Sequence, residues 1–435
     1  MTSIWSESTR LPHFPTLEGD IKTDVLIIGG GITGTLCAYF LQEKGVDYVL
    51  VEGRTICSGV TSNTTAKITS QHGLIYQKLL KSYGAEKTSL YLKANQDALD
   101  KYREICENIS CDFQTRTAYV YSLDNRKKLE KEAEALAEIG FDAPVLNMTE
   151  LPFPVAGAIA FENQAQFHPL KFISSVARNL KIYEHTFVKE MKEHTAVTDR
   201  AAITFQKVIF ATHFPIDNKH GMYFLKLYQH RSYVIALDHA VGWDGMYVDE
   251  AMNGMSFRSY NGLLLIGGGD HRTGRRGGNW KELREFAEKY YPCAREISCW
   301  ATQDCMSLDG IPYIGQCSAN TPDSYVATGF NKWGITSAMT AGMLLTDLIM
   351  GKENPYADIF SHSRNMMKPQ LFYNGCEALK NLITITPRRC PHMGCALQWN
   401  SLERSWDCPC HGSRFDEMGV LLDNPANGDM RKNNV

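Results

Sequence analysis

The spacing of apolar residues near the N-terminus changes from continuous to helical and back again. A short apolar run at 24–28 is typical of a buried parallel strand, and a cluster of glycines follows it at once. Residues 36–45 then place their apolar side chains on one helical face and end at a glycine. A second apolar run, 48–51, ends at Glu52. The pattern predicts a strand, a glycine-rich turn, a helix and a second strand in succession.

Farther along the chain, the pattern predicts both helices and antiparallel strands. Apolar residues recur at spacings of three and four in the longer segments, whereas shorter apolar runs are typical of strands. A polar, proline-flanked segment at 352–370 is typical of a linker between domains. The predicted helices are 88–107, 125–140 and the largely apolar 336–351, and the predicted antiparallel strands are 231–237 and 263–267.

The glycines after the first strand have the spacing G-x-G-x-x-G, formed by Gly29, Gly31 and Gly34. Glycines at these positions let the backbone approach a pyrophosphate at the start of a helix. Glu52 follows the middle glycine by 21 residues and can accept hydrogen bonds from both ribose hydroxyls. Because strand, turn, helix, strand and acid occur in order, the sequence favours a dinucleotide site over a turn without a ligand. The turn alone leaves open whether the dinucleotide is FAD or NAD.

The last fifty residues contain two short segments that each pair cysteine with histidine. The first is C-P-H-M-G-C at 390–395, and the second is C-P-C-H-G-S at 408–413. Two thiolates and two imidazoles can hold a two-iron cluster, which raises its reduction potential above that of an all-cysteine cluster. A structural zinc site is the alternative, because cysteine and histidine also suit zinc. Zinc explains neither the second pair of cysteines nor the Gly-Ser-Arg-Phe run that follows.

These two segments, with Gly419 and the Asn-Pro-Ala run at 424–426, resemble the Rieske proteins of the cytochrome bc1/b6f type. The resemblance implies a [2Fe-2S] cluster covered by the proline loop. The implied residues are Cys390 and Cys408 on one iron, His392 and His411 on the other, and Cys395 and Cys410 in a disulfide that braces the two loops.

The segment before the first ligand loop is shorter than in this family. A typical member has several strands there, which form a base sheet, whereas here only 382–386 resembles a strand. The resemblance therefore implies a small all-β module with a shortened base sheet. We expect the rest of the chain, or a second subunit, to supply the missing support.

Segments spread over about 22–350 resemble the D-amino acid oxidase/glycine oxidase superfamily of flavoproteins, in the order of that family. The resemblance implies that FAD is the dinucleotide and that a last helix points its first amides at the flavin, which stabilises negative charge on the ring. The segments are 58–67, 183–188, 207–212, 264–270, 309–315 and 326–336. The implied FAD-binding residues are Gly29, Gly31, Ile32, Thr33, Gly34, Glu52, Gly53, Arg54, Thr65, Ala66, Lys67, Val188, Ala211, Thr212, Gly310, Gly329, Trp333, Gly334, Ile335 and Thr336.

Together, the two resemblances imply an α/β fold of two interleaved domains and a C-terminal module. A Rossmann-like FAD-binding domain alternates along the chain with an α+β substrate domain built on an antiparallel sheet. The expected parts are 22–80, 155–215 and 306–350 for FAD binding, 81–154 and 216–305 for substrate, 352–370 for the linker and 371–435 for the Rieske domain.

The flavoprotein resemblance implies that a substrate C–H bond beside an amine nitrogen gives a hydride to the flavin, and that water hydrolyses the imine product. A one-electron centre on the same chain favours a dehydrogenase that exchanges electrons with an external partner protein. The expected substrate is a small amine or amino-acid-like molecule. Three alternatives stay open: an oxygen-using oxidase with a structural or regulatory Rieske module, a non-enzymatic electron carrier, and a zinc-stabilised NAD enzyme.

The sequence offers few candidate substrate contacts. Family members that act on amino acids often carry a carboxylate-clamping arginine before the segment that matches 309–312, and here Asp304 stands in its place. An acid there suits a cationic amine better, although a solvated loop acid is the alternative. Arg231 and Arg272 are substitute anchors, unless they are ordinary ion-pair arginines. A covalent flavin link through Cys305 is a further alternative.

The composition changes this picture little. The 435 residues are 44% hydrophobic and 21% charged, with a formal net charge of −3, which is typical of a globular protein and gives no sign of a nucleic-acid surface. The N-terminal segment lacks the apolar core of a secretory signal, and no stretch has the length and low charge of a membrane span. We therefore expect a cytoplasmic location. The 13 cysteines are too sparse to indicate a disulfide scaffold.

Overall fold

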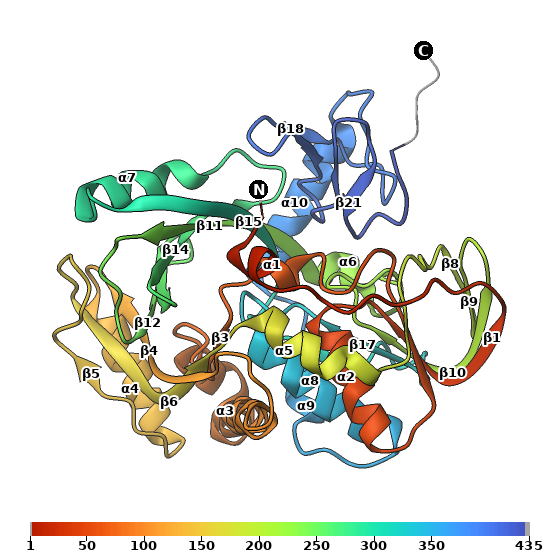
Figure 1. Ribbon diagram of the computed structural model, residues 1–435, viewed down its shortest axis with the longest axis horizontal. Coiled ribbons are helices and arrows are strands. Elements are labelled where there is room, and N and C mark those ends of the chain that lie inside the picture. Colours follow the sequence, from red (N-terminus) through yellow and green to blue (C-terminus); the bar gives the residue numbers. More distant parts are fainter. Residues whose placement is uncertain (1, 431–435) are drawn as a thin grey trace.

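The computed structural model describes residues 2–430, and two large sheets dominate it (Figure 1). The first sheet has the order β16-β17-β10-β1-β2-β7, in which β16 is antiparallel and the other pairs are parallel. A hairpin of β8 and β9 extends it beside β10. The strands are β1 (Ile21–Ile28), β2 (Tyr48–Val51), β7 (Ile182–Tyr183), β8 (Glu190–Lys192), β9 (Thr195–Val197), β10 (Ala202–Phe210), β16 (Tyr313–Gln316) and β17 (Ser324–Thr328).

Helices cover this sheet and close the first core. The helix α2 (Ile32–Glu43) packs so closely against α8 (Gly334–Ile349) that a Cβ added to Gly342 would lie 2.9 Å from the Phe40 ring. The long α3 (Tyr76–Cys106) is kinked at Gly84, whose φ is +78°. Shorter elements are α1 (Ile4–Ser8), α5 (Pro169–Val176), α6 (Tyr223–Lys226), α9 (Ala357–Phe360) and the 3₁₀ turns Val60–Asn63, Ala177–Asn179 and His220–Met222.

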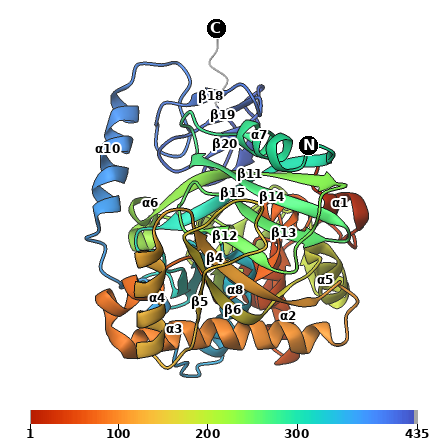
Figure 2. The same ribbon diagram turned by 90° about the vertical axis from the view of Figure 1, so that its left-hand side faces the viewer.

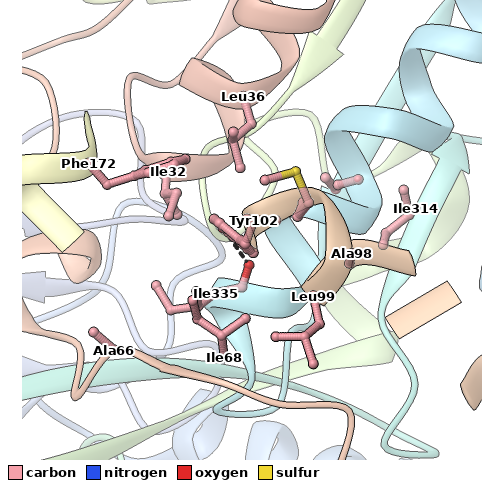
Figure 3. Close-up of a cluster of buried hydrophobic side chains, with 14 of the residues drawn as sticks. Ile32, Leu36, Ala66, Ile68, Ala98, Leu99, Tyr102, Phe172, Ile314 and Ile335 are labelled. Carbon is pink, nitrogen blue, oxygen red and sulfur yellow. Dashed lines mark hydrogen bonds between the residues drawn. The ribbon is translucent and has the colours of Figure 1, made fainter. Parts of the chain in front are cut away.

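Side chains from α2, α3 and α8 meet in a buried cluster (Figure 3). Ile32 and Leu36 come from α2, and Leu99 and Tyr102 come from α3. The Tyr102 hydroxyl donates a hydrogen bond of 2.9 Å to the carbonyl oxygen of Ile335, the second residue of α8. This core therefore fixes the start of α8 relative to the glycine turn that begins α2.

The second sheet has the order β15-β11-β14-β13-β12-β4-β6-β3, with β5 beside β6. Its neighbouring strands are antiparallel except for β12 and β4. The predicted antiparallel strands at 231–237 and 263–267 are confirmed, and the structure shows that they pair with each other. The strands are β3 (Lys67–Ile68), β4 (Gln114–Ser122), β5 (Val145–Leu146), β6 (Gly157–Gln166), β11 (Leu227–Asp238), β12 (Met246–Asp249), β13 (Ser256–Tyr260), β14 (Leu263–Arg272) and β15 (Arg295–Ser307).

Some elements differ from the sequence prediction in extent or place. The helix predicted at 88–107 begins earlier, at the start of α3, and the one predicted at 125–140 is α4 (Arg126–Glu138). The helix α7 (Trp280–Tyr290) packs on β11 and β14. The sequence assigns 155–215 to the FAD-binding domain, but β6 pairs along its length with β4 and so lies in the second sheet.

The C-terminal module lies beside β11 and β15 (Figure 1). It consists of α10 (Pro369–Ile383) and a sheet of four short strands, β18 (Gln398–Asn400), β19 (Ser405–Asp407), β20 (Arg414–Phe415) and β21 (Leu421–Asp423). The strand predicted at 382–386 is wrong, because Leu382 and Ile383 form the last turn of α10. The Arg389 guanidinium donates a hydrogen bond of 3.1 Å to the Leu382 carbonyl, and such tertiary contacts override the β-branched preference of this run.

Among residues 2–430, no helix combines the length and the apolar composition needed to cross a lipid bilayer.

Candidate functional site

A cavity of about 730 Å³ extends from the first sheet to the second. Its wall runs from the glycine turn after β1, past Glu52 and the first turn of α8, to β11, β14 and β15. This volume falls within the range of about 300–1,000 Å³ that is typical of ligand sites. Most of the predicted FAD-binding residues line this cavity. The exceptions, which lie behind its wall, are Gly34, Ala66, Gly329 and Thr336.

The turn between β1 and α2 requires glycine at two positions. Gly29 has a φ of +111°, and a Cβ there would lie 2.6 Å from the Ala211 carbonyl oxygen. A Cβ on Gly34 would collide with the Gly29 carbonyl oxygen. At Gly31 the nearest atom to an added Cβ is Thr61 Oγ1, 3.3 Å away, and the glycine itself lines the cavity. The start of α2 is thus open to an anion, as a pyrophosphate site requires.

Glu52 stabilises this turn from the end of β2. Its Oε2 accepts a hydrogen bond of 2.7 Å from the Gly30 amide, and its Oε1 accepts one of 2.9 Å from the Arg54 amide. Burial raises the pKa of the Glu52 carboxyl, against the lowering effect of these bonds. The side chain lines the cavity, and each carboxylate oxygen has a second lone pair. Glu52 can therefore hold the turn and accept hydrogen bonds from ribose hydroxyls at the same time.

We expect Glu52→Ala to weaken FAD binding about tenfold to a hundredfold, because it removes charge-assisted hydrogen bonds of about 1.5–3 kcal/mol. Titration of the apoprotein with FAD, followed by flavin fluorescence, measures the affinity. Glu43→Ala, which replaces an exposed acid on α2, is the matched control and should bind FAD as the wild type does. Equal affinities for Glu52→Ala and wild type would contradict this role of Glu52.

The loop at 58–67 is held in place by a buried arginine. Arg258 of β13 donates hydrogen bonds of 2.5 and 2.8 Å to the carbonyl oxygens of Thr65 and Ala66. Lys67 lines the cavity at the end of this loop. Burial lowers the pKa of the Lys67 amine to about 7, and repulsion from the Arg258 guanidinium contributes to the lowering to a smaller extent. Lys67 is thus a cavity residue whose charge changes near neutral pH.

The start of α8 is fixed to the segment that follows β3. Thr336 Oγ1 accepts a hydrogen bond of 3.0 Å from the Thr69 amide and donates one of 2.9 Å to the Thr69 carbonyl. The Trp333 ring stacks on His72 with the ring centroids 5.0 Å apart. These contacts explain why Thr336 lies behind the wall, while Trp333, Gly334 and Ile335 line the cavity.

At the other end of the cavity, acids of the second sheet line the wall, among them Asp304 and Asp270. Asp304 of β15 accepts a hydrogen bond of 2.8 Å from Ser232 Oγ, and burial raises the pKa of its carboxyl. Asp270 of β14 pairs with Lys332 at 2.7 Å, and its buried Oδ1 has no hydrogen-bond partner within residues 2–430. Among the described lining residues, the only arginine is Arg54, at the dinucleotide end. The acidic end thus offers no guanidinium clamp for a carboxylate.

The two candidate arginines bind the C-terminal module instead of facing the cavity. Arg231 forms a buried ion pair with Glu403. Arg272 donates hydrogen bonds of 2.9 Å to two backbone carbonyls of the second Cys-His segment. Of the three candidate substrate residues, the structure therefore places only Asp304 in the cavity wall. Cys305, its neighbour, also lines the cavity, with its thiol bonded to a threonine hydroxyl.

The two Cys-His segments come together at a buried site. The rings of His392 and His411 lie with their centroids 5.0 Å apart, and the thiols of Cys390 and Cys408 are hydrogen-bonded to each other. Within residues 2–430, the buried Nδ1 atom of each histidine has no hydrogen-bond partner. Burial lowers the pKa of the His392 imidazole to about 4 and that of His411 to about 3. Two neutral imidazoles with unpaired Nδ1 atoms beside two thiols fit a two-iron cluster.

The opposite edges of both imidazoles are bonded to the body of the protein. His392 Nε2 lies 3.0 Å from Asn218 Oδ1, and His411 Nε2 lies 2.9 Å from the Phe224 carbonyl oxygen. Because both partners are acceptors, each Nε2 carries the proton and each Nδ1 keeps its lone pair. Beside the histidines, Cys395 and Cys410 form a disulfide.

Two glutamines of the second sheet hold the second Cys-His loop. Gln229 of β11 donates a hydrogen bond of 2.8 Å to the His411 carbonyl, and Gln303 of β15 donates one of 2.9 Å to the Gly412 carbonyl. The strand neighbours of these glutamines, at 228, 302 and 304, line the cavity. Gln229, Gln303 and Asn218 belong to no motif, so sequence reasoning missed them. For the two glutamines, the alternation of side chains along β11 and β15 was a signal that they face away from the residues that line the cavity.

The module also closes the dinucleotide end of the cavity. The Arg54 guanidinium donates hydrogen bonds of 2.8 and 2.6 Å to the carbonyl oxygens of Leu421 and Leu422. Asn424 donates one of 2.6 Å to the Thr212 carbonyl, at the end of the first sheet. Residues 421–424 therefore form part of the cavity wall.

Comparison with protein families decides between the possible cofactors. Residues 24–348 match the family model DAO, described as FAD dependent oxidoreductase, and residues 370–433 match the Rieske [2Fe-2S] domain. The chain belongs to the DAO family of FAD-dependent oxidoreductases and carries a C-terminal Rieske domain. Both predicted resemblances and the predicted fold class are confirmed, and the cofactors of this DAO-family protein are FAD and a [2Fe-2S] cluster.

Individual relatives match either nearly the whole chain or about four fifths of it. YhfW of Bacillus subtilis, named as a Rieske 2Fe-2S iron-sulfur protein, is 35% identical over 98% of this chain and 96% of its own length. Gamma-glutamylputrescine oxidoreductase of Escherichia coli is 22% identical over 80% of this chain and 88% of its own. The crystal structure of glycine oxidase from Geobacillus kaustophilus superposes with a TM-score of 0.66 at 19% identity, covering 79% of this chain and 99% of that one. The last likeness shows the fold alone.

Proposed function

We propose that this protein is a dehydrogenase that oxidises an amine or amino-acid-like substrate and passes the electrons one at a time, through its Rieske cluster, to an external partner protein. The shared sheet carries this proposal. The strands β11 and β15 line the cavity with some residues and hold the His411 loop with their neighbours. One sheet layer therefore separates the cavity from the cluster loops, and stacked layers lie only about 10 Å apart.

The cofactors supply the redox chemistry, since bound FAD accepts a hydride and the cluster takes up single electrons. The residues of the chain hold and orient them. Glu52, the glycine turn and the first turn of α8 would hold the FAD in the cavity. Cys390 and Cys408 would ligate one iron, and His392 and His411 would ligate the other through their Nδ1 atoms, which have no hydrogen-bond partner within residues 2–430.

The acids of the cavity support an amine rather than a clamped carboxylate as the substrate anchor. Asp304 and the unpaired Oδ1 of Asp270 can each accept a hydrogen bond from an ammonium group. No arginine lies beside them among the described lining residues. The Escherichia coli relative is named for a putrescine derivative, which is an amine and supports the same class.

Anaerobic reduction by substrate tests this proposal directly. A panel of putrescine, sarcosine, glycine and proline is mixed with the complete protein, and flavin absorbance and the electron paramagnetic resonance of the cluster are followed together. We expect the reduced-cluster signal to appear as the flavin bleaches. A bleached flavin beside a cluster that stays oxidised would overturn the electron route. In a parallel measurement in aerated buffer, hydrogen peroxide formed in proportion to turnover would favour the oxygen-using oxidase.

The pKa of Lys67 predicts a pH dependence of substrate affinity. Below about pH 7 the Lys67 amine becomes charged and repels a cationic substrate, so KM should rise about tenfold between pH 8 and pH 6. Lys67→Met should remove this rise, because no charge then develops. Lys67→Arg, which stays charged throughout, should give a high KM at every pH. A KM profile that is the same in all three proteins would contradict the role of Lys67.

A further inference from the structure

The helix α10 has its polar side buried and its apolar side in solvent. Asn374, Glu377 and Asn381, at spacings of three and four, are buried. Phe372, Leu379 and Ile383, on the other side, are 65%, 62% and 72% exposed. A surface helix of a globular protein normally has the reverse arrangement. Figure 2 shows α10 standing at the outer edge of the molecule, so nothing within residues 2–430 covers this apolar stripe.

Hydrogen bonds prevent the helix from rolling its apolar side inward. Asn374 Oδ1 accepts a bond of 2.7 Å from the Arg272 guanidinium. Glu377 forms an ion pair with Arg275 and accepts a bond of 3.0 Å from Asn381. Rotation of α10 would break these bonds and remove one acceptor from the buried Arg272 guanidinium, which is costly. The apolar side is thus fixed outward by the fold.

The exposed stripe continues to the cluster. Ile385, just after α10, is 98% exposed, and Met393, next to the proposed ligand His392, is also exposed. The Arg389 guanidinium joins the two segments, because it donates hydrogen bonds to the carbonyls of Leu382 at 3.1 Å and Gly394 at 2.7 Å. We call Phe372, Leu379, Ile383, Ile385 and Met393 the α10 face.

The other side of the cluster is closed to a partner. The Nε2 edges of His392 and His411 are bonded to Asn218 and to the Phe224 carbonyl, within the body of the protein. A protein that exchanges electrons with the cluster must therefore approach from the side of Met393, which belongs to the α10 face.

The charges around the α10 face are basic. Between residues 367 and 393 the only acid is Glu377, which is buried and paired. Arg388 lies over the Trp406 ring at 5.0 Å, and the Arg389 guanidinium is bonded to backbone carbonyls, so both guanidinium groups are held in place. Fixed charges around an apolar centre match a defined protein surface better than fluid lipid headgroups. The basic residues are Lys368, Lys380, Arg388 and Arg389.

We propose that the α10 face is the docking surface for an acidic one-electron carrier protein. This inference rests on the proposed function, because it identifies where the external partner binds. In each encounter the docked carrier gains one electron and the reduced protein loses one, so two encounters complete each two-electron substrate oxidation. No proton or atom is transferred between the two proteins.

The test uses the complete protein with both cofactors, reduced by dithionite so that it does not depend on a substrate. Plastocyanin, an acidic one-electron acceptor, and cytochrome c, a basic one, are the probes. Dissociation constants are measured by titration, and electron-transfer rates by anaerobic stopped flow. We expect plastocyanin to bind more tightly than cytochrome c, with an affinity that falls as salt rises.

Three variants decide the outcome. Leu379→Glu/Ile383→Glu should weaken plastocyanin binding at least about tenfold, or 1.4 kcal/mol, and slow transfer to it. Lys380→Glu, which leaves the apolar residues intact, should reverse the preference toward cytochrome c. Met418→Glu, at an exposed methionine of the same module, should change nothing. Flavin and cluster spectra should be the same in all of them.

The proposal is overturned if both α10 variants bind plastocyanin as the wild type does, or if Met418→Glu weakens binding equally. It is also overturned if the wild type sediments with vesicles of one part phosphatidylglycerol to three parts phosphatidylcholine and the double variant does not, because the face then binds lipid. A dimer of the wild type that the double variant loses would assign the face to a second copy. A cluster that substrate never reduces would refute the proposed function and leave this binding result intact.

Discussion

The Cys408→Ser protein is expected to lose its iron while it keeps FAD. Cys408 is buried with its thiol bonded to that of Cys390, and a serine hydroxyl is a poor ligand for iron in this set. Iron should fall from about two atoms per chain to nearly none. Flavin reduction by substrate should continue, because the cavity lies on the other side of β11 and β15. Electron transfer to a one-electron acceptor protein should fall by more than about a hundredfold.

Metal analysis, flavin absorbance and stopped-flow rates together measure this result. Cys317→Ser is the matched control, because Cys317 is an equally buried thiol that belongs to neither Cys-His segment. It should keep iron, FAD and transfer to the acceptor. Zinc in place of iron in the wild-type protein would contradict the cluster and its role in electron transfer. So would undiminished transfer to the acceptor in iron-free Cys408→Ser, since electrons would then leave directly from the flavin.

Local backbone requirements made part of the site predictable from the sequence. The turn at Gly29 and Gly34 admits no Cβ, so the spacing of the glycines records the geometry directly. The two Cys-His segments were equally informative about the cluster site, because closely spaced cysteine and histidine residues are rarely needed except to bind a metal or a cluster. In both cases the order of residues along the chain corresponds to a short, contiguous piece of the fold.

Contacts between distant segments could not be predicted in the same way. Arg231 and Arg272 have the residue type of a substrate clamp, but the direction of each side chain depends on which face of the second sheet meets the module. The supporting Gln229, Gln303 and Asn218 have no distinctive spacing at all. Their role appears only when β11, β15 and the segment before α6 meet the His411 and His392 loops.

The error at 382–386 has the same origin. The run Leu-Ile-Thr-Ile-Thr has β-branched residues typical of a strand, yet its first two residues end α10. The helix persists because Asn374 and Glu377, earlier in α10, bond to Arg272 at the end of β14 and to Arg275 in the turn that follows it. The sequence therefore indicated a short base for the module, and the structure shows that buried polar bonds to the body take the place of the missing strands.

Among these bonds, the pair between Arg231 and Glu403 should matter most for the attachment of the module. Both side chains are buried, and Glu403 also pairs with Arg414 at 2.9 Å. Arg231→Met should destabilise the docked module by about 3 kcal/mol, because it leaves part of a buried negative charge uncompensated. Hydrogen exchange of β18–β21 and proteolysis at 352–370 should both become faster. Cluster reduction by substrate should slow while flavin reduction does not.

Two further variants test whether the effect of Arg231→Met comes from the buried ion pair and not simply from the loss of a positive charge. Arg404→Met breaks the exposed pair with Glu417 in the same module and should cost less than about 1 kcal/mol. The double variant Arg231→Met/Glu403→Gln should recover part of the loss, since no uncompensated carboxylate remains. Equal protection from exchange in Arg231→Met and Arg404→Met would show that the buried pair does not hold the module.

The pH dependence of docking gives an independent check on the same pair. Burial opposes ionisation of Glu403, but Arg231 and Arg414 outweigh it and lower the pKa of the carboxyl below its ordinary value of 4.5. A carboxyl with a lowered pKa in the folded state stabilises the fold above its unfolded pKa and ceases to do so as the pH falls through the folded one. Exchange of the module strands should therefore be insensitive to pH above 4.5, after correction for the chemical rate, and increase below it. In Arg231→Met the increase should be smaller, because Arg414 alone then holds the carboxylate and the folded pKa of Glu403 lies closer to the unfolded one.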